Sequence, residues 1–481
     1  MTSLTIKTSL FPYQCDAVEK LRHLCIGALY MEMGTGKTRT ALELVKIRHD
    51  AGKINAVLWL CPCSVKQNLK YDIMYHCGEK PDWIVIRGIE SIAGSDTLYL
   101  KLLNFVKKNR VYLIVDESNM VKNPFAKRTQ RITELSRHCK YKMILNGTPV
   151  SRNEADMFAQ WYILDWRILG YKSYYSFSAN HLVYRTVKLP DGREVTTNQI
   201  VNVLDVDYLT ERIKPFSYQI RKADCIKLPS KNYHTCIYKM TNEQYDIYMD
   251  VKDVYLFNVE DFRSDTIYQY FSALQHVTSG MNVVSYPTEK MRTKPIFKDW
   301  SENPRVIELK DTLINAIGDE QVIVFTKYKH EVEDIEVMMD YYNISYAEFT
   351  GRLPQKKRQQ SLQRFRDGDA QVLISNKMCG AYGLNLQFCR NIVFYNNDFD
   401  FATRSQSEDR VHRIGQTQEV HIYDIVAVDT IDTFICNNLD SKCSLVEAFK
   451  RCLDKSREKK KSNSASSNLK VLQTEFIKNR I

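Results

Sequence analysis

The sequence predicts an α/β protein of two lobes, each with a parallel sheet flanked by helices, and with helical insertions between the lobes. Three observations favour this fold class. A chain of 481 residues is longer than one hydrophobic core usually organises. Short apolar runs alternate with helical patterns in the first part, and the alternation starts again after Pro304. Near-continuous apolar strands separated by helices are typical of parallel sheets that are covered on both faces.

The first lobe is expected to contain buried strands joined by helices. The predicted strands are Gly27 to Met31, Ala56 to Cys61, Trp83 to Arg87, Val111 to Val115 and Tyr141 to Leu145. The predicted helices are Thr38 to His49, Val65 to His76, Thr97 to Lys108 and Arg128 to His138. The strands are short and apolar, as expected of a sheet that is buried on both sides.

The second lobe repeats this pattern. Its predicted strands are Val322 to Thr326, Ser345 to Phe349, Val372 to Ser375, Ile392 to Tyr395 and His421 to Val428. Between the lobes, Trp161 to Met291 is rich in Tyr and Lys and contains helical stretches at Gln244 to Phe257 and Ser264 to Val277. We therefore predict a first lobe at 1–225 with an insertion at about 161–215, a connection with a helical insertion at 226–303, a second lobe at 304–445 and a basic tail at 446–481.

Composition excludes several other classes of protein. The 44% hydrophobic and 26% charged residues are ordinary for a soluble chain, and the sequence shows neither a signal peptide nor a membrane span. The 13 cysteines include no CxxC pair, so we expect buried free thiols rather than a zinc site. Four of them lie within apolar patterns: Cys15, Cys25, Cys379 and Cys389. We therefore expect the protein to remain in a cytosol-like compartment.

The net charge of +11 is concentrated at the C-terminus. From Val446 onward the chain has ten basic and four acidic residues. Such a tail would be attracted to nucleic-acid phosphates, although a solvated helix with a flexible end explains it equally well.

A phosphate-binding loop, MGTGKT, spans Met33 to Thr38. It follows a predicted strand and opens a predicted helix, which is the context that this motif requires. The backbone N–H groups of Gly34, Thr35 and Gly36 would turn toward the β-phosphate of a nucleotide. Lys37 would reach the β and γ oxygens, and the Thr38 hydroxyl would bind Mg²⁺.

Two carboxylates, Asp116 and Glu117, end the predicted strand Val111 to Val115. Ligands of open α/β sheets bind at this end of the strands. We expect Asp116 to bind Mg²⁺ and Glu117 to orient or deprotonate the attacking water. Shortly before the loop, the amide of Gln14 offers a donor and an acceptor side by side, which matches the edge of adenine.

Arg410 and Arg413 lie three residues apart in QSEDRVHRIGQ, and on a helix they would share one face. Two such guanidiniums can bind the terminal phosphate of a nucleotide and stabilise the charge of phosphoryl transfer. This arrangement predicts a two-lobed ATPase motor.

The ordered motifs of the chain resemble those of superfamily-2 helicase-like ATPases, specifically the Swi/Snf-type DNA translocases, in a minimal form that suits a virus, a phage or a bacterium. The resemblance runs from Leu10 to about Ile435. It is carried by LFPYQ, MEMGTGKT, LCPCS, LIVDES, NGTPVSRNE, IRKADCIKLPSK, GAYGLNLQ and QSEDRVHRIGQTQEVHIYDIVAVDTID. It implies two RecA-like lobes that close on ATP and walk along DNA.

The resemblance also implies roles for individual residues. Gln14, Gly34, Thr35, Gly36, Lys37, Thr38, Gly383 and Asn385 match nucleotide-binding positions. Lys37, Glu117, Arg410 and Arg413 match catalytic positions, and Thr38 and Asp116 match the Mg²⁺ ligands. Ser64, Thr148, Thr326 and Lys327 fall where the family contacts nucleic acid.

Three hypotheses about function follow. The first is an ATP hydrolase, with Mg²⁺, that moves along double-stranded DNA and remodels DNA structures or protein–DNA complexes. The second is a helicase that separates DNA strands or RNA–DNA hybrids in replication, recombination or transcription, with tyrosines of the insertions stacking on bases. The third is a scaffold that binds nucleic acid and uses the nucleotide only as a switch.

The expected partner is double-stranded DNA, with forked or branched DNA and RNA–DNA hybrids as alternatives and a protein partner not identifiable from the sequence. We expect a monomer without membrane association, in the cytosol of a bacterium or host, or in the nucleus of a eukaryote.

Overall fold

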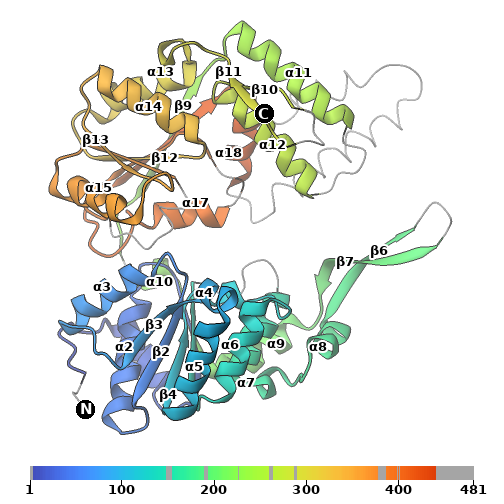
Figure 1. Cartoon of the computed structure of the whole chain (residues 1–481), viewed down its shortest axis with the longest axis vertical. Coiled ribbons are helices and arrows are strands. Elements are labelled where there is room, and N and C mark those ends of the chain that lie inside the picture. Colours follow the sequence, from blue (N-terminus) through green and yellow to red (C-terminus); the bar gives the residue numbers. More distant parts are fainter. Residues whose placement is uncertain are drawn as a thin grey trace. The chain divides into compact units, whose positions relative to one another are not determined.

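The computed structural model describes residues 4–147, 154–188, 193–225, 227–258, 264–285, 290–376, 386–397, 399 and 401–439. The chain forms two compact units, Met1–Lys227 and Leu228–Ile481. Within the described residues each unit contains one six-stranded parallel sheet with helices packed on it (Figure 1). The predicted α/β class, with two lobes, is therefore confirmed.

The first unit has the strand order β3-β2-β4-β5-β1-β8, and all neighbours are parallel. Its strands are β1 (Ile26–Met31), β2 (Ala56–Cys61), β3 (Ile84–Gly88), β4 (Val111–Val115), β5 (Tyr141–Asn146) and β8 (Ser217–Ile220). Its helices are α1 (Pro12–Leu21), α2 (Lys37–Asp50), α3 (Lys66–Cys77), α4 (Ile89–Gly94), α5 (Asp96–Lys108), α6 (Lys127–Arg137), α7 (Met157–Leu169), α8 (Tyr174–His181), α9 (Val206–Ile213) and α10 (Lys222–Cys225).

Alternate residues of each central strand enter different hydrophobic cores. In β2, Val57 and Trp59 pack with α1, α2 and α3, whereas Leu58 and Leu60 pack with α4 to α7 on the opposite face. All four side chains are buried. The continuous apolar run of β2 follows from this double burial.

A β-hairpin forms part of the insertion in the first unit. Its strands β6 (Leu182–Lys188) and β7 (Glu194–Val203) pair in antiparallel fashion, with register shifts near Tyr184. In Figure 1 the hairpin extends away from helices α7 to α9. The sequence pattern predicted an insertion here but did not predict this hairpin.

The second unit has the strand order β13-β14-β12-β15-β16-β9, again all parallel. Its strands are β9 (Lys231–Tyr238), β12 (Val322–Thr326), β13 (Tyr346–Phe349), β14 (Val372–Asn376), β15 (Asn391–Phe394) and β16 (Val420–Ala427), with a small separate pair β10 (Met281–Val283) and β11 (Thr293–Pro295). Its helices are α11 (Asn242–Asn258), α12 (Ser264–Thr278), α13 (Pro304–Asp311), α14 (Lys329–Tyr341), α15 (Gln355–Asp367), α17 (Phe401–Glu408) and α18 (Ile431–Leu439).

The predicted strands of both lobes are confirmed, to within one or two residues at each end. Two further strands, β8 and β9, lie within Trp161 to Met291, the segment in which no strand was predicted. Each is the edge strand of its sheet. Their half-exposed, polar sequences, SYQI and KNYHTCIY, lack the apolar run that identifies a central strand.

The prediction of buried cysteines was wrong at Cys63, which is exposed, and at two of the four cysteines assigned to apolar patterns. Cys15 and Cys25 are exposed, whereas Cys389 is buried and Cys379 lies outside the described residues. Cys15 lies on α1 close to the buried Tyr13 and Ala17, and Cys25 lies between the partly buried Leu24 and Ile26, so the local pattern did not reveal which side of the backbone the thiols occupy.

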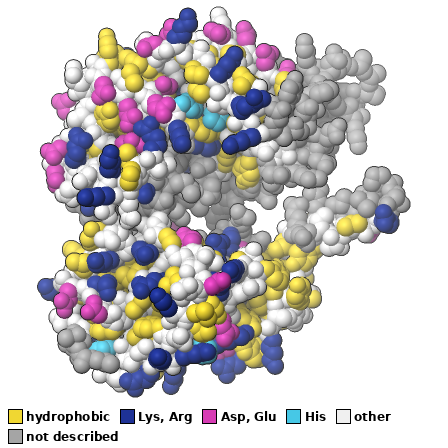
Figure 2. Space-filling view, viewed as in Figure 1, with side chains coloured by type: hydrophobic (Ala, Val, Ile, Leu, Met, Phe, Trp, Pro, Cys, Tyr) yellow, Lys and Arg dark blue, Asp and Glu magenta, His cyan; other side chains and the backbone are white. Residues whose placement is uncertain are grey.

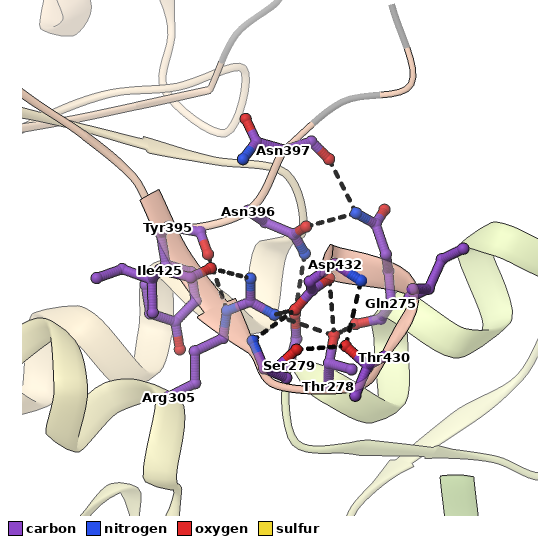
Figure 3. Close-up of polar contacts among 12 residues, drawn as sticks. Gln275, Thr278, Ser279, Arg305, Tyr395, Asn396, Asn397, Ile425, Thr430 and Asp432 are labelled. Carbon is purple, nitrogen blue, oxygen red and sulfur yellow. Dashed lines mark hydrogen bonds and ion pairs between the residues drawn. The ribbon is translucent and has the colours of Figure 1, made fainter. Parts of the chain in front are cut away.

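The buried guanidinium of one residue joins three helices and two strands of the second unit (Figure 3). Arg305, at the start of α13, is fully buried and donates hydrogen bonds to the backbone oxygens of Tyr395 (2.8 Å) and Ile425 (3.0 Å). It also contacts Thr278 Oγ1 and Asp432 Oδ2, both at 3.0 Å. Helices α12, α13 and α18 are thereby tied to the ends of β15 and β16.

The replacement Arg305→Met should destabilise the second unit by about 3–5 kcal/mol, because it leaves the Asp432 carboxylate buried without its ion-pair partner. Arg390→Met is the matched control, since the pair of Arg390 with Glu320 is partly exposed and should contribute at most about 1 kcal/mol. Urea titration combined with limited proteolysis would follow each unit separately. Equal losses in the two variants would contradict the role of Arg305.

Candidate nucleotide site

The phosphate loop connects β1 to α2 in the first unit. Gly34 (φ +80°) and Gly36 (φ +82°) adopt the left-handed conformation that glycine accepts without strain. The Thr35 amide donates to Glu32 O at 3.2 Å, and the Thr40 amide donates to Gly36 O at 3.1 Å. The loop therefore makes a tight turn and leads directly into the first turn of the helix that contains Lys37 and Thr38.

Lys37 and Asp116 lie close enough to influence each other. Lys37 Nζ donates to Met31 O at 2.7 Å and to Glu32 O at 3.4 Å. Burial raises the pKa of Asp116 to about 7, the charge of Glu117 adds to this rise, and the Lys37 ammonium opposes it. The structure thus brings together the lysine of the loop and the first of the two predicted carboxylates.

Glu117 has an unusual backbone conformation at the end of β4. Its φ of +48° lies in the left-handed region, and it precedes a short 3₁₀ helix, Ser118–Val121. Its amide donates to Asp116 Oδ1 at 3.0 Å, while the Asp116 amide donates to Leu60 O at 2.7 Å. A strained non-glycine residue of this kind is a common feature of functional sites.

Gln14 and Tyr13 hold the phosphate loop from α1. The buried Gln14 amide accepts from Phe11 N (3.0 Å) and donates through Nε2 to Thr35 O (3.0 Å). Tyr13 donates its hydroxyl to the same Thr35 oxygen at 3.1 Å. Gln14 Nε2 has a second hydrogen, so contact with the loop is compatible with the predicted contact with adenine. The sequence offered no signal for Tyr13, because a backbone carbonyl is its partner.

The side chains present fit a magnesium ion. A hydroxyl on Thr38 and carboxylates on Asp116 and Glu117 are hard oxygen donors, the kind that Mg²⁺ binds. The charge of Glu117 raises the pKa of Asp116, so this partly buried pair favours a nearby cation. No cluster of three or more His, Cys, Asp or Glu suited to a metal occurs within the described ranges. The site formed by Thr38, Asp116 and Glu117 matches Mg²⁺, because this ion usually binds one or two carboxylates together with substrate phosphates.

The prediction that Arg410 and Arg413 lie on one face of a helix was wrong. Helix α17 ends at Glu408, and both Arg410 and Arg413 lie in the turns that follow. Arg410 is buried, whereas Arg413 is partly exposed. Their spacing of three residues therefore does not place the two side chains on a common helix face. Within the turn, the Arg410 amide donates to Ser407 O and its carbonyl accepts from Leu386 N. Gly383 and Asn385 lie outside the described residues.

The predicted nucleic-acid contacts differ in exposure. Ser64, between β2 and α3, is partly exposed. Thr326 is fully buried at the end of β12. Lys327 Nζ donates to Gln275 Oε1 at 2.6 Å and lies 3.4 Å from the centre of the Phe399 ring. Thr148 lies outside the described residues. Burial of Thr326 means that its side chain does not face solvent in this structure.

Comparisons with known proteins place these residues in a family. An SNF2-related domain matches residues 83–285, and a helicase conserved C-terminal domain matches residues 305–415. The chromodomain-helicase-DNA-binding protein 1-like of Danio rerio is 23% identical over 91% of this chain and 44% of its own length. The ATP-dependent helicase fft1 of Schizosaccharomyces pombe is 21% identical over 87% of this chain and 50% of its own length.

A solved structure, the Sulfolobus solfataricus SWI2/SNF2 ATPase core in complex with dsDNA, is 21% identical with a TM-score of 0.40 and covers 94% of this chain and 93% of that chain. The chain spans about half or less of the length of the curated relatives described above. The two matched domains are those of ATP-hydrolysing enzymes of helicase superfamily 2. The chain thus contains an SNF2-related domain followed by a helicase C-terminal domain, as expected of a Swi/Snf-type ATPase of this superfamily.

The replacement Gly36→Ala should weaken ATP binding by at least about tenfold, because its Cβ would overlap the Gln14 amide that holds the loop. Gly52→Ala is the matched control, since Gly52 also has a positive φ (+61°) but open space around it. Both variants should lose about 1–2 kcal/mol of stability to backbone strain. Fluorescence titration with a labelled ATP would measure the difference, and equal ATP affinities in the two variants would contradict the clash.

Proposed function

We propose that this protein is a DNA-stimulated ATPase that moves along double-stranded DNA. One observation carries the proposal: Lys37, Asp116 and Gln14 lie around a phosphate loop in which Gly34 and Gly36 adopt positive φ angles. A glycine loop at the start of a helix is suited to binding an anion. The matched SNF2-related and helicase C-terminal domains support the same activity.

In this proposal the first unit binds and orients the nucleotide. Gln14 contacts the adenine edge, the loop amides from Gly34 to Gly36 contact the phosphates, and Lys37 neutralises the charge that develops on the γ-phosphate. Mg²⁺, bound by Thr38 and Asp116, would neutralise further phosphate charge. Glu117 orients the attacking water.

The second unit is proposed to supply the remaining cations. Arg410 and Arg413, together with Gly383 and Asn385, would contact the nucleotide held by the first unit and stabilise the transferring phosphoryl group. Binding of ATP would then favour closure of the two units, and hydrolysis would release them. Repetition of this cycle on DNA produces movement.

Contacts with DNA are proposed to be electrostatic and independent of sequence. Lys and Arg side chains, dark blue in Figure 2, are spread over the visible face of both units and are mixed with acidic ones. Ser64, Thr148 and Lys327 remain proposed points of contact with the DNA backbone, whereas the buried side chain of Thr326 is not kept as one. Binding should therefore weaken steeply as salt is raised.

Two other functions are less well supported. For strand separation, three tyrosines of the insertions, Tyr248, Tyr255 and Tyr270, are buried in the core of the second unit and do not face a base. Stacking would fall to exposed tyrosines such as Tyr175, Tyr208 and Tyr245. A nucleotide-switched scaffold without turnover does not need the strained Glu117 or the partly buried Asp116 beside Lys37. None of the helices in the described part of the chain is long and apolar enough to cross a membrane.

The replacements Lys37→Ala and Arg410→Ala should each reduce duplex-stimulated ATP turnover by at least about 100-fold, because each removes charge stabilisation of phosphoryl transfer. Lys46→Ala on α2 and Arg390→Ala in the second unit are matched controls, since both side chains form surface ion pairs. Turnover would be measured with duplex, single-stranded, forked and RNA ligands at two salt concentrations. Full turnover in Lys37→Ala would remove the proposed function.

A triplex-displacement assay separates the two modes of action on DNA. A protein that tracks along a duplex should displace the third strand while the duplex remains paired. Opening of the duplex at the same rate would favour the strand-separating helicase, and absence of turnover with every ligand despite tight ATP binding would favour the scaffold.

A further inference from the structure

Glu32 occupies a junction between the phosphate loop and the rest of the first unit. Its carbonyl oxygen accepts from the Thr35 amide (3.2 Å), the Thr35 hydroxyl (2.7 Å) and Lys37 Nζ (3.4 Å). Three donors of the loop thus converge on one backbone oxygen. Any rearrangement of Lys37 or Thr35 changes the environment of the Glu32 peptide.

Glu32 also binds the segment that leads out of the first unit. Its amide donates to Ile220 O (3.2 Å), which extends the pairing of β1 with β8 by one residue. Its side-chain oxygen Oε2 accepts from the amide of Lys222 at 2.6 Å. A short hydrogen bond from an N–H to a carboxylate is stronger than one between neutral groups. Lys222 is buried, so water competes little for this contact.

The Glu32–Lys222 hydrogen bond lies at the start of the path into the second unit. Lys222 is the first residue of the short helix α10, which ends at Cys225. The first unit ends at Lys227, and β9 of the second unit begins at Lys231. Residues 226–230 separate α10 from β9 in the sequence, so α10 is the last helix of the first unit before the second unit begins.

We propose that Glu32 is a positioning residue that transmits the state of the phosphate loop to the connector, defined here as Arg221 to Ser230. The inference deepens the proposed function at the same site. When a phosphate takes the Lys37 ammonium, the hydrogen bonds from Nζ to Met31 O and Glu32 O are exchanged for stronger, charge-assisted ones. The Glu32 peptide then relaxes, and its carboxylate carries the change to the Lys222 amide.

Hydrogen exchange would test this transmission directly. The probe is the non-hydrolysable analogue AMP-PNP with Mg²⁺, added to the whole chain without DNA. In the wild type, saturating AMP-PNP should slow exchange in the phosphate loop and also slow exchange of the connector amides by about tenfold. In Glu32→Ala the loop should still respond, but the connector should not.

Three further single variants and one double variant separate the hydrogen bond from other effects of substitution. Glu32→Gln keeps the acceptor and should restore the connector response. Lys222→Pro removes the donor at the first position of a helix, where proline is tolerated, and should abolish the response. Lys222→Ala keeps the amide and should behave as the wild type. The double variant Glu32→Ala/Lys222→Pro should resemble either single variant, because both act through one hydrogen bond.

Steady-state kinetics adds a readout that a loss of folding would not produce. Glu32→Ala should lower kcat of duplex-stimulated turnover by about tenfold while KM for ATP changes less than threefold, and Glu32→Gln should recover most of kcat. A connector that responds in Glu32→Ala as it does in the wild type would overturn the inference. The inference would also be overturned if, in the wild type, AMP-PNP slowed hydrogen exchange in the loop but left exchange of the connector amides unchanged. If the loop itself gains no protection, the proposed function fails first and the inference falls with it.

Discussion

The position of the phosphate loop depends on two backbone carbonyls, those of Glu32 and Thr35. Thr35 O accepts from Tyr13 and Gln14 on α1, and Glu32 O accepts from Thr35 and Lys37 within the loop. Strand β1, which leads into the loop, lies between β5 and β8 inside the sheet. The loop amides are therefore oriented before any ligand arrives, so little reorganisation opposes binding of an anion.

The chemistry of the acidic pair follows from where β4 ends. The strand is buried on both faces, and its last hydrogen bond joins Asp116 to β2, so the Asp116 carboxylate begins inside the protein. Burial and the neighbouring Glu117 favour the protonated form, whereas Lys37 favours the ionised form. A cation at this point would shift that balance further toward the carboxylate. The same sheet that stabilises the fold thus prepares a site for a charged ligand.

The sequence predicted the buried parts of this structure better than its edges. The bounds of β2, β4 and β12 agree with the predicted ranges because apolar residues fill both faces of these strands. Edge strands β8 and β9 carry no such run. Side chains that bind backbone carbonyls, such as Tyr13, leave no motif, and neither does the bond from the Lys222 amide to Glu32. The turn around Arg410 was mistaken for a helix because a three-residue spacing alone cannot distinguish the two.

The central claim is that Arg410 and Arg413 approach the same nucleotide as the phosphate loop. Iron-directed backbone cleavage tests it most directly, with Fe²⁺ replacing Mg²⁺ beside ADP–aluminium fluoride in the presence of duplex DNA. Cuts should appear near Lys37, near Asp116 and also between Arg410 and Arg413, and all should disappear when excess Mg²⁺ is added. Cuts in the first unit alone, with the nucleotide tightly bound and DNA present, would contradict the account.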